Sequence, residues 1–221
     1  LPQQSRLYAS DGTTQIGTFY AQNRIVVPLK KISKPMRQAV VSREDRRFFR
    51  HAGVDIQGVM RAFVATYVKK GATQGGSSLT QQYVKNVLLL QAQEDNDPIA
   101  EYHASEETVA RKLREMLIAV QMEKTYSKLE ILQGYLNIAQ FGRGIYGVEM
   151  AARRYFSTTA DKLDIVQAAT IAAITKNPAA FDPSVESNQK ASQRERNIVL
   201  DLMYQEEYIS QKQRDEAKAK P

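Results

Sequence analysis

The residues best suited to chemistry form a charged cluster at positions 44–55. It contains the adjacent acids Glu44 and Asp45, three arginines, His51 and a closing Asp55. A carboxylate suits general-base catalysis, because it can take a proton from an attacking hydroxyl group. The helix expected before this cluster ends near Glu44, and helix C-termini favour cations, so the acids do not serve the helix dipole. The cluster could be functional or an exposed ion-pair network, and His51 could carry a proton or hold a turn, and these alternatives remain open at this point.

A second polar group stands at the expected start of a helix. Its residues run from Gly75 and Gly76 through Ser77, Ser78, Leu79, Thr80, Gln81 and Gln82 to Lys85 and Asn86. Glycines and hydroxyl groups at a helix start suit an anion or sugar oxygens, because the first backbone N–H groups there are free to bind. Thr80, Gln81 and Lys85 recur about one turn apart, which indicates a polar helix face. A simple linker is the alternative for the glycines.

The third group lies on a helix expected at residues 108–124. Arg111, Lys112 and Glu115 fall within about a quarter turn of one another on one side of it. The opposite side collects the apolar residues Val109, Leu113, Met116, Leu117 and Val120. Arg111 and Glu115 are four residues apart and suit a surface ion pair worth a few tenths of a kcal/mol. Spacing alone therefore favours a salt-bridged, solvent-exposed face.

Composition narrows the class of protein but does not select one. The 221 residues are 43% hydrophobic, which supports a folded core, and carry a net charge of +7. That charge suits nucleic acid, anionic lipid headgroups or a phosphorylated substrate. There is no cysteine, which excludes disulfides and thiolate metal sites, and no apolar run approaches the roughly 20 residues of a membrane span. Because the chain begins with Leu1, we expect an excised domain of a longer protein.

The elements that must position these groups are mainly helical. Residues 1–30 predict extended structure, with Arg6–Ala9 and Ile16–Tyr20 around a turn at Asp11-Gly12 and Arg24–Val27 alongside. From Ser33, a plausible N-cap followed by Pro35, the pattern is helical. We expect one domain over 1–221, with a helical body at 33–208 and a terminal helix or linker at 209–221.

Two segments interrupt the series of later helices. Residues 56–68 are apolar at helical spacing and suit either a buried core helix or a helix lying in a membrane interface. Residues 91–107 are acidic and aperiodic, which predicts a solvated loop followed by a helix capped at Ser105. The remaining helices are expected after a capping box at Ser127, at 161–176, and at roughly 187–204 and 210–219.

Together, in this order, the motifs resemble those of the family 51 glycosyltransferases, found in class A penicillin-binding proteins and monofunctional transglycosylases. Glu-Asp-x-x-Phe-x-x-His-x-Gly, Gly-x-Ser-x-x-Thr-Gln-Gln and Arg-Lys-x-x-Glu are matched from Glu44, Gly75 and Arg111 onward. Lys-x-x-Ile-Leu-x-x-Tyr-Leu-Asn is matched from Lys128, and an Ala/Ile-rich helix ends before Asn177-Pro178. The resemblance spans about residues 11–208. It departs at Ser78, where Thr is usual, at Gln133, where Glu is frequent, and in the length of segment 91–107.

The resemblance implies a lysozyme-like helical fold with a short N-terminal β segment, and it implies roles for individual residues. Glu44 would be the catalytic base and Glu115 the second catalytic residue, acting directly or through a divalent cation, Mg²⁺ or Mn²⁺. No organic cofactor is implied. Substrate binding would fall to Asp45, Ser77, Thr80, Gln81, Gln82, Lys85, Asn86, Arg111 and Lys112, with the three cations holding a pyrophosphate.

The same resemblance implies the substrates and the setting. Lipid II and a growing lipid-linked glycan would be the substrates, joined by a β-1,4 bond with inversion at the extracytoplasmic face of the bacterial plasma membrane. The parent protein would be anchored by an N-terminal transmembrane helix absent here. A fused transpeptidase domain and other cell-wall synthesis proteins are compatible partners, and nucleic acid is not expected.

Three other functions compete with this interpretation. A lysozyme-like hydrolase also uses two carboxylates, but a neutral glycan gives no reason to gather Lys85, Arg111 and Lys112. A nucleic-acid-binding protein would keep acids such as Glu44 away from its basic surface. A catalytically inactive scaffold is suggested by Gln133, whereas the presence of Glu44, Lys85 and Glu115 argues for an active enzyme.

Overall fold

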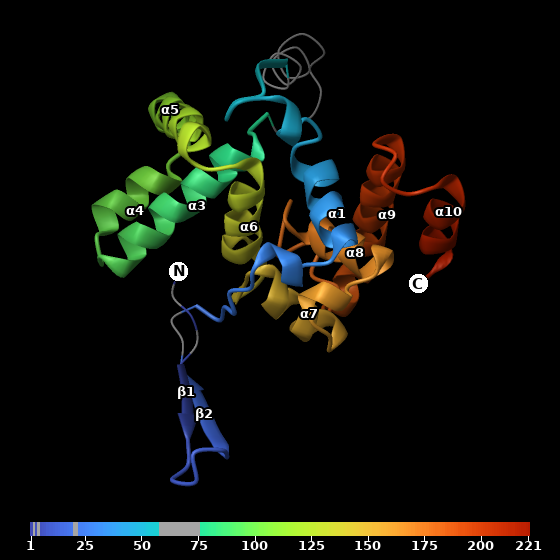
Figure 1. Cartoon of the computed structure of the whole chain (residues 1–221), viewed down its shortest axis with the longest axis horizontal. Coiled ribbons are helices and arrows are strands. Elements are labelled where there is room, and N and C mark those ends of the chain that lie inside the picture. Colours follow the sequence, from blue (N-terminus) through green and yellow to red (C-terminus); the bar gives the residue numbers. More distant parts are fainter. Residues whose placement is uncertain (2, 4, 20–21, 58–75) are drawn as a thin grey trace. The chain divides into compact units, whose positions relative to one another are not determined.

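The computed structural model describes the chain except residues 2, 4, 20–21 and 58–75, and the side chains of 6, 18 and 19. The described chain is mainly helical with a few short strands, which confirms the fold class expected from the sequence (Figure 1). It forms two compact units, Leu1–Arg43 with Leu136–Pro221, and Glu44–Tyr135. The single-domain organisation stays a prediction. No helix in the described ranges is long and apolar enough to cross a bilayer.

The first unit begins with the predicted β-hairpin. Strands β1 (Ser5–Tyr8) and β2 (Gln15–Phe19) pair antiparallel around the turn at Asp11. The Asp11 carboxylate accepts the side-chain hydroxyl and backbone N–H of Thr14 and the N–H of Thr13. These hydrogen bonds lower the pKa of Asp11 to about 2. The turn is thereby held by its own side chains, as the Asp-Gly pair predicts.

The third strand predicted at Arg24–Val27 does not form. Asn23 instead makes an isolated bridge to Ile145, and both backbone polar groups of Val27 bind the side-chain amide of Asn137 at 2.9 Å. One asparagine therefore supplies the donor and acceptor that a neighbouring strand would have supplied.

Helix α8 (Ile165–Ile174) forms the core of the first unit. Nearly all of its residues are apolar, and α7 (Val148–Phe156), α9 (Gln189–Gln205) and α10 (Gln211–Ala219) pack against it, with strand β3 (Gln140–Gly142). The helix begins later than predicted, because Asp164 provides its N-cap and Asp161 lies in a 3₁₀ turn. Strand β3 pairs with strand β4 (Ile145–Tyr146) in the same unit. The described part of the unit also contains 3₁₀ turns at Leu29–Lys31, Ala160–Lys162 and Glu186–Asn188.

Helix α1 (Lys34–Glu44) ends at the predicted catalytic residue. Ser33 accepts the N–H of Met36 at 3.2 Å and Pro35 lies in the first turn, so the predicted start is confirmed. Glu44 is the last residue of the helix and the first of the second unit.

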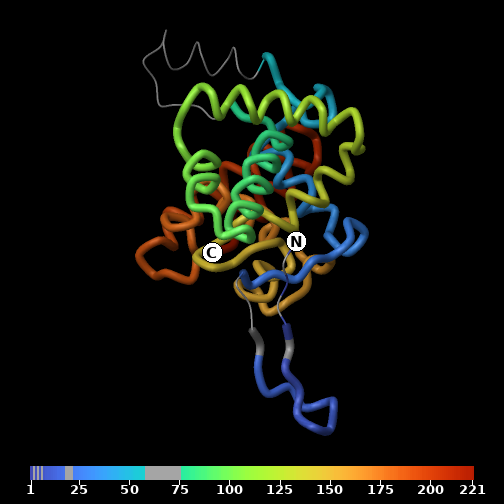
Figure 2. The backbone as a smooth tube through the Cα atoms, turned by 90° about the vertical axis from the view of Figure 1, so that its left-hand side faces the viewer, coloured from blue at the N-terminus to red at the C-terminus, as the bar shows by residue number. Residues whose placement is uncertain are grey.

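The second unit carries the polar motifs. Its described elements are a 3₁₀ turn at Phe48–Arg50 and helices α3 (Leu79–Glu94), α4 (Pro98–Ser105), α5 (Val109–Thr125) and α6 (Lys128–Ile138), which runs on into the first unit. Both α4 and α5 pack against α3 (Figures 1 and 2). The capping box at Ser127 is confirmed by its reciprocal bonds with Glu130. The apolar segment 56–68 lies almost wholly outside the described residues, as does Gly75.

The solvated loop predicted at 91–107 is wrong. Helix α3 continues to Glu94, and α4 follows after a short turn. Asp97 accepts the N–H groups of Ile99 and Ala100, and Pro98 occupies the first helical position, so a helix starts inside the segment predicted to be a loop. Ser105 does not cap α5 either, because that N-cap is Thr108, whose hydroxyl accepts the N–H of Arg111 at 3.1 Å.

Helix α5 is turned the opposite way from the solvent-exposed polar face that spacing predicts. Glu115 is only 1% exposed, whereas Leu117 is 74% exposed. Val109 and Leu113 share the exposed side, and Ala119 is fully buried. The salt-bridged surface interpretation is therefore wrong: the helix packs through a narrow polar and small-residue stripe and presents its apolar stripe outward.

Gly53 permits the close approach of α5 to the loop that follows Phe48. A Cβ atom on Gly53 would lie 2.7 Å from the backbone of Ala119 and Val120. The residue also has a φ of +83°, which L-amino acids with side chains rarely adopt. Both constraints explain why glycine occupies this position of the motif.

We expect Gly53→Ala to destabilise the domain by about 3 kcal/mol or more, because backbone strain and a backbone clash add. Gly144→Ala is the matched control, since Gly144 also has a positive φ, +71°, but nothing within 4 Å of its Cβ position. The control should lose about 1 kcal/mol. The measurement is the urea midpoint by circular dichroism, and equal losses in both variants would contradict the close-packing explanation.

Candidate active site

The two adjacent carboxylates of the first motif have different surroundings. Asp45 is buried, while Glu44 is half-buried. Glu44 Oε2 accepts the side-chain N–H of Gln82 at 2.8 Å. Gln82 Oε1 in turn accepts the hydroxyl of Tyr135 at 3.2 Å. Of the two acids, Glu44 is therefore the one that a solvent-borne hydroxyl can reach.

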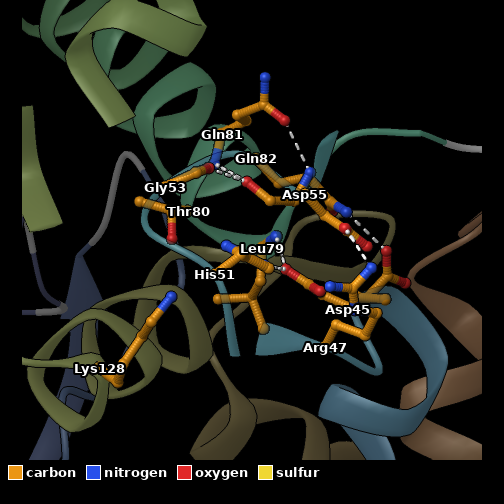
Figure 3. A network of polar contacts seen from close by, with 12 residues as sticks. Asp45, Arg47, His51, Gly53, Asp55, Leu79, Thr80, Gln81, Gln82 and Lys128 are labelled. Atoms are coloured by element: carbon orange, nitrogen blue, oxygen red, sulfur yellow. Dashed lines mark hydrogen bonds and ion pairs between the residues drawn. The ribbon is translucent and has the colours of Figure 1, made fainter. Parts of the chain in front are cut away.

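Asp45 fastens the motif to the start of α3. Its Oδ2 accepts the backbone N–H of Leu79 at 3.0 Å and lies 2.8 Å from His51 Nε2 (Figure 3). Leu79 is the first residue of α3, so the carboxylate also lies at the positive end of the helix dipole. The hydroxyl of Ser78, the N-cap, donates to the carbonyl of Gly53. Both contacts tie residues 45–53 to the second motif.

A second buried carboxylate, Glu123, joins three motifs. It accepts the hydroxyl of Thr80, and Lys128 donates to it at 2.7 Å. The Lys128 ammonium also lies 4.5 Å from the ring centre of Phe48, in cation–π geometry. Phe48 is fully buried and makes an edge contact with His51. Figure 3 shows Lys128 and Thr80 near this cluster.

The third motif surrounds a third buried carboxylate. Glu115 accepts a hydrogen bond from Arg111 on Oε1 and one from Lys112 on Oε2, the latter at 2.8 Å. Arg111 also donates to the backbone carbonyl of Glu106, which holds the turn before α5. Lys112 is the more exposed of the two cations. Two positive charges thus compensate one buried negative charge, which leaves the cluster net positive.

Helix α3 connects the Glu44 side of the site with the Glu115 cluster. A cavity of about 410 Å³ lies between α3, α4 and α5, and its lining includes Leu88, Arg111 and Glu115. Leu88 is about 9 Å along the helix axis from Gln82, by the rise of an α-helix. Lys85 stands one turn before Leu88 on the same face and makes no ion pair with any described residue. A cation with no ion pair among the described residues therefore lies along α3 between the carboxylate of Glu44 and the cationic cluster.

The structure sorts the predicted substrate-binding residues by accessibility. Ser77, Gln82, Lys85, Asn86, Arg111 and Lys112 are half-buried. Thr80 and Gln81 are fully buried, and Gln81 is held in a capping box with Ser78. Thr80, Gln81 and Asp45 each make hydrogen bonds to other described residues of the chain. Their predicted contact with substrate stays a prediction.

The residues around Glu115 do not fit a divalent cation. Both of its oxygens accept hydrogen bonds from cations, and no group of three potential metal ligands occurs among the described residues. Magnesium and manganese need several oxygen ligands, which this pair of salt bridges does not offer. The metal role of Glu115 stays a prediction.

Sequence reasoning assigned no role to Tyr135, Glu123 or Lys128. Tyr135 and Lys128 belong to the fourth motif, which marked them as family residues without indicating what they do. Glu123 gave a physical signal, because an acid in the last turn of a helix opposes the helix dipole and needs another reason to be there. That reason is its contact with Thr80 and Lys128.

Similarity to known proteins agrees with the motifs. A family model described as Transglycosylase matches residues 12–204. The chain belongs to the transglycosylase family. It is therefore an enzyme domain of the peptidoglycan glycosyltransferase class.

Among its curated relatives, this transglycosylase is 37% identical to penicillin-binding protein 2D of Bacillus subtilis over 221 residues, all of the chain and 30% of that protein. It is 38% identical to penicillin-binding protein 1A of Aquifex aeolicus over 220 residues, or 28% of that protein. The chain thus spans less than a third of the length of these relatives. A crystal structure of penicillin-binding protein 1A from Haemophilus influenzae matches with a TM-score of 0.50 at 22% identity, over all of this chain and 20% of that one. This match supports the expected helical fold.

We expect Asp45→Ala to destabilise the transglycosylase by about 3 kcal/mol, because Leu79 and His51 both lose a charged, buried acceptor. Asp45→Asn should lose roughly half as much, since an amide oxygen can replace the single oxygen that accepts both bonds. Thermal unfolding of the two variants is the measurement. Asp95→Ala, at the exposed C-terminal end of α3, is the control and should lose nothing. An Asp45→Ala variant as stable as the control would contradict this role.

Proposed function

We propose that this domain polymerises lipid II into β-1,4-linked glycan strands with inversion, and that Glu44 is the general base. The observation that carries the proposal is the contrast between neighbouring carboxylates. Asp45 is buried and engaged by a backbone N–H and a histidine, whereas Glu44 is half-buried and oriented by Gln82. Asp45 holds the motif in place, and the more accessible Glu44 acts on an incoming hydroxyl.

The chemical step is a displacement at the anomeric carbon of the lipid-linked donor. Glu44 takes the proton of the acceptor's 4-hydroxyl, and that oxygen forms the new glycosidic bond. The bond from the anomeric carbon to the pyrophosphate oxygen breaks, and the lipid pyrophosphate leaves with the electron pair. A well-placed base is typically worth about 10² to 10⁴ in rate.

The pyrophosphate needs positive charge that is held in place before the reaction. Glu115 fixes Arg111 and Lys112 by hydrogen bonds to its two oxygens. Lys85, which has no ion pair with any described residue, lies on the connecting helix face. Preorganised cations stabilise the charge that develops on the leaving group. We assign Glu115 to holding these cations. Ser77, just before α3, and Asn86, in the middle of that helix, are both half-buried and are proposed contacts of the donor substrate.

The exposed apolar stripe of α5 supports an interfacial location. Val109, Leu113 and Leu117 stand outward on one side of the helix whose other side carries the pyrophosphate-binding cations. We propose that this stripe contacts the bilayer in which both substrates are anchored, with the net charge of +7 favouring an anionic leaflet. The natural setting is then the extracytoplasmic face of a bacterial plasma membrane. Membrane anchoring and a fused transpeptidase domain in the parent protein are part of this proposal.

The base assignment is tested by following glycan polymer made from labelled lipid II by the purified domain. We expect Glu44→Gln to lower the rate by about 10² to 10⁴, because a neutral amide cannot accept the proton. Glu115→Gln should lower it by about 10-fold or more, since Arg111 and Lys112 lose their shared anion. Glu94→Gln, an exposed acid at the end of α3, is the control and should keep the wild-type rate.

Two outcomes of that assay contradict the proposal. Full activity in Glu44→Gln ends the general-base assignment. Release of free disaccharide from finished glycan by the wild type favours hydrolysis over polymerisation.

The membrane assignment is tested by sedimentation with vesicles containing phosphatidylglycerol. We expect the double variant Leu113→Asp, Leu117→Asp to bind about 10-fold or more weakly, because two leucine side chains no longer enter the interface. Its thermal midpoint should stay unchanged, since both residues are exposed. Ile198→Asp, an exposed apolar position on α9, is the control. Equal binding of the double variant and the control would show that the α5 stripe does not contact the bilayer.

A further inference from the structure

Gln82 stands between Glu44 and a buried tyrosine. Its Nε2 donates to Glu44 Oε2 at 2.8 Å, and its Oε1 accepts the Tyr135 hydroxyl at 3.2 Å. The two ends of one amide are thus used in opposite senses, one as a donor and one as an acceptor. The chain of contacts runs from α6 through α3 to the end of α1.

The Tyr135 hydroxyl fixes which end of the amide faces Glu44. An ionised carboxylate only accepts hydrogen bonds, so it needs the NH₂ end of Gln82. Turning the amide around would place its oxygen against the carboxylate and its NH₂ group against the hydroxyl. Because Tyr135 donates to the amide oxygen, it opposes that turn and strengthens the N–H that points at Glu44.

Burial keeps Tyr135 in the donor form. The side chain is almost completely buried, and both this burial and the nearby Glu44 charge raise the pKa of Tyr135 well above its ordinary value. The hydroxyl therefore keeps its proton at neutral pH. It supplies a constant donor to Gln82.

The helices that carry this chain of contacts are held at a fixed distance. Gly134, next to Tyr135, packs against the ring of Tyr83, next to Gln82, so closely that a Cβ would lie 2.4 Å from the ring. Such direct contact leaves little freedom for α6 to shift against α3 at this level. The Tyr135–Gln82 hydrogen bond is therefore set by the packing of the helices.

We propose that Tyr135 is a positioning residue, which acts through the side-chain amide of Gln82 to hold the Glu44 carboxylate in place for proton abstraction. This rests on the proposed function, in which Glu44 is the base. It also gives Gln82 a role other than the substrate contact predicted from its motif: the amide orients the base, and the tyrosine orients the amide.

The test compares Tyr135→Phe, Gln82→Leu and the double variant in steady-state lipid II polymerisation. We expect Tyr135→Phe to lower kcat about 10-fold, from the loss of one buried hydrogen bond, with KM within about twofold of wild type. Gln82→Leu should lower kcat at least as much. The double variant should be no slower than Gln82→Leu alone, because the hydroxyl acts only through the amide.

Tyr83→Phe is the matched control. It removes a half-buried tyrosine hydroxyl one residue from Gln82 that has no hydrogen bond with any described residue. Its kcat should lie within about twofold of wild type. Thermal midpoints of all variants show whether a loss of kcat reflects unfolding.

Several results would overturn the positioning role. They are a wild-type kcat in Tyr135→Phe, a rise of KM with kcat unchanged, or losses that multiply in the double variant. If Tyr135→Phe does not fold, Gln82→Leu decides, and a wild-type kcat there overturns the proposal. Glu44→Gln, measured alongside, separates the two claims: its full activity refutes the base, whereas its inactivity beside a fully active Tyr135→Phe refutes only the positioning.

Discussion

The second unit is organised by the need to satisfy carboxylates that are buried. Asp45, Glu115 and Glu123 each have side chains no more than 5% exposed. A buried anion is costly unless charged or polar donors surround it, so each of these acids holds two donors. Those donors come from the loop after α1, from α3, from α5 and from α6. The acids therefore act as fixed points that hold separate segments of the chain together.

This constraint also explains the orientation of α5. Because Glu115 and Ala119 face inward, the helix can approach Gly53 closely, and its leucines are left on the outside. In water this arrangement forgoes the free energy of burying the leucines, which is about 1.5–3 kcal/mol for each side chain. Under the proposed function the substrates are anchored in lipid, and an exposed apolar stripe of this kind can enter the membrane interface. Under the proposed function, the same helix would hold the leaving group with one face and contact the bilayer with the other.

Much of the fold could be predicted from local signals in the sequence. The hairpin at Asp11, the start of α1 at Ser33 and the capping box at Ser127 depend on contacts within a few residues, and all three are confirmed. The prediction of a loop at 91–107 was wrong because it rested on the charged, aperiodic residues and overlooked Asp97, a good N-cap followed by proline. The third strand failed because Asn137, more than 100 positions away, takes the place of a neighbouring strand.

The candidate site divides in the same way. The sequence by itself determined the family and the residue types, because five motifs in order carry that information without coordinates. Only the tertiary structure decided which members of each motif are accessible. Glu44 and Asp45 are neighbours of the same charge type, and no local pattern separates them. Gln82 contacts Glu44, whereas Leu79 and His51 contact Asp45. Gln82 and Leu79 are distant from the acids in sequence, and a turn brings His51 back to Asp45, so only the fold distinguishes the two acids. Spacing likewise placed Arg111, Lys112 and Glu115 on one face, but which way that face points depends on what packs against it, and helical periodicity carries no such information.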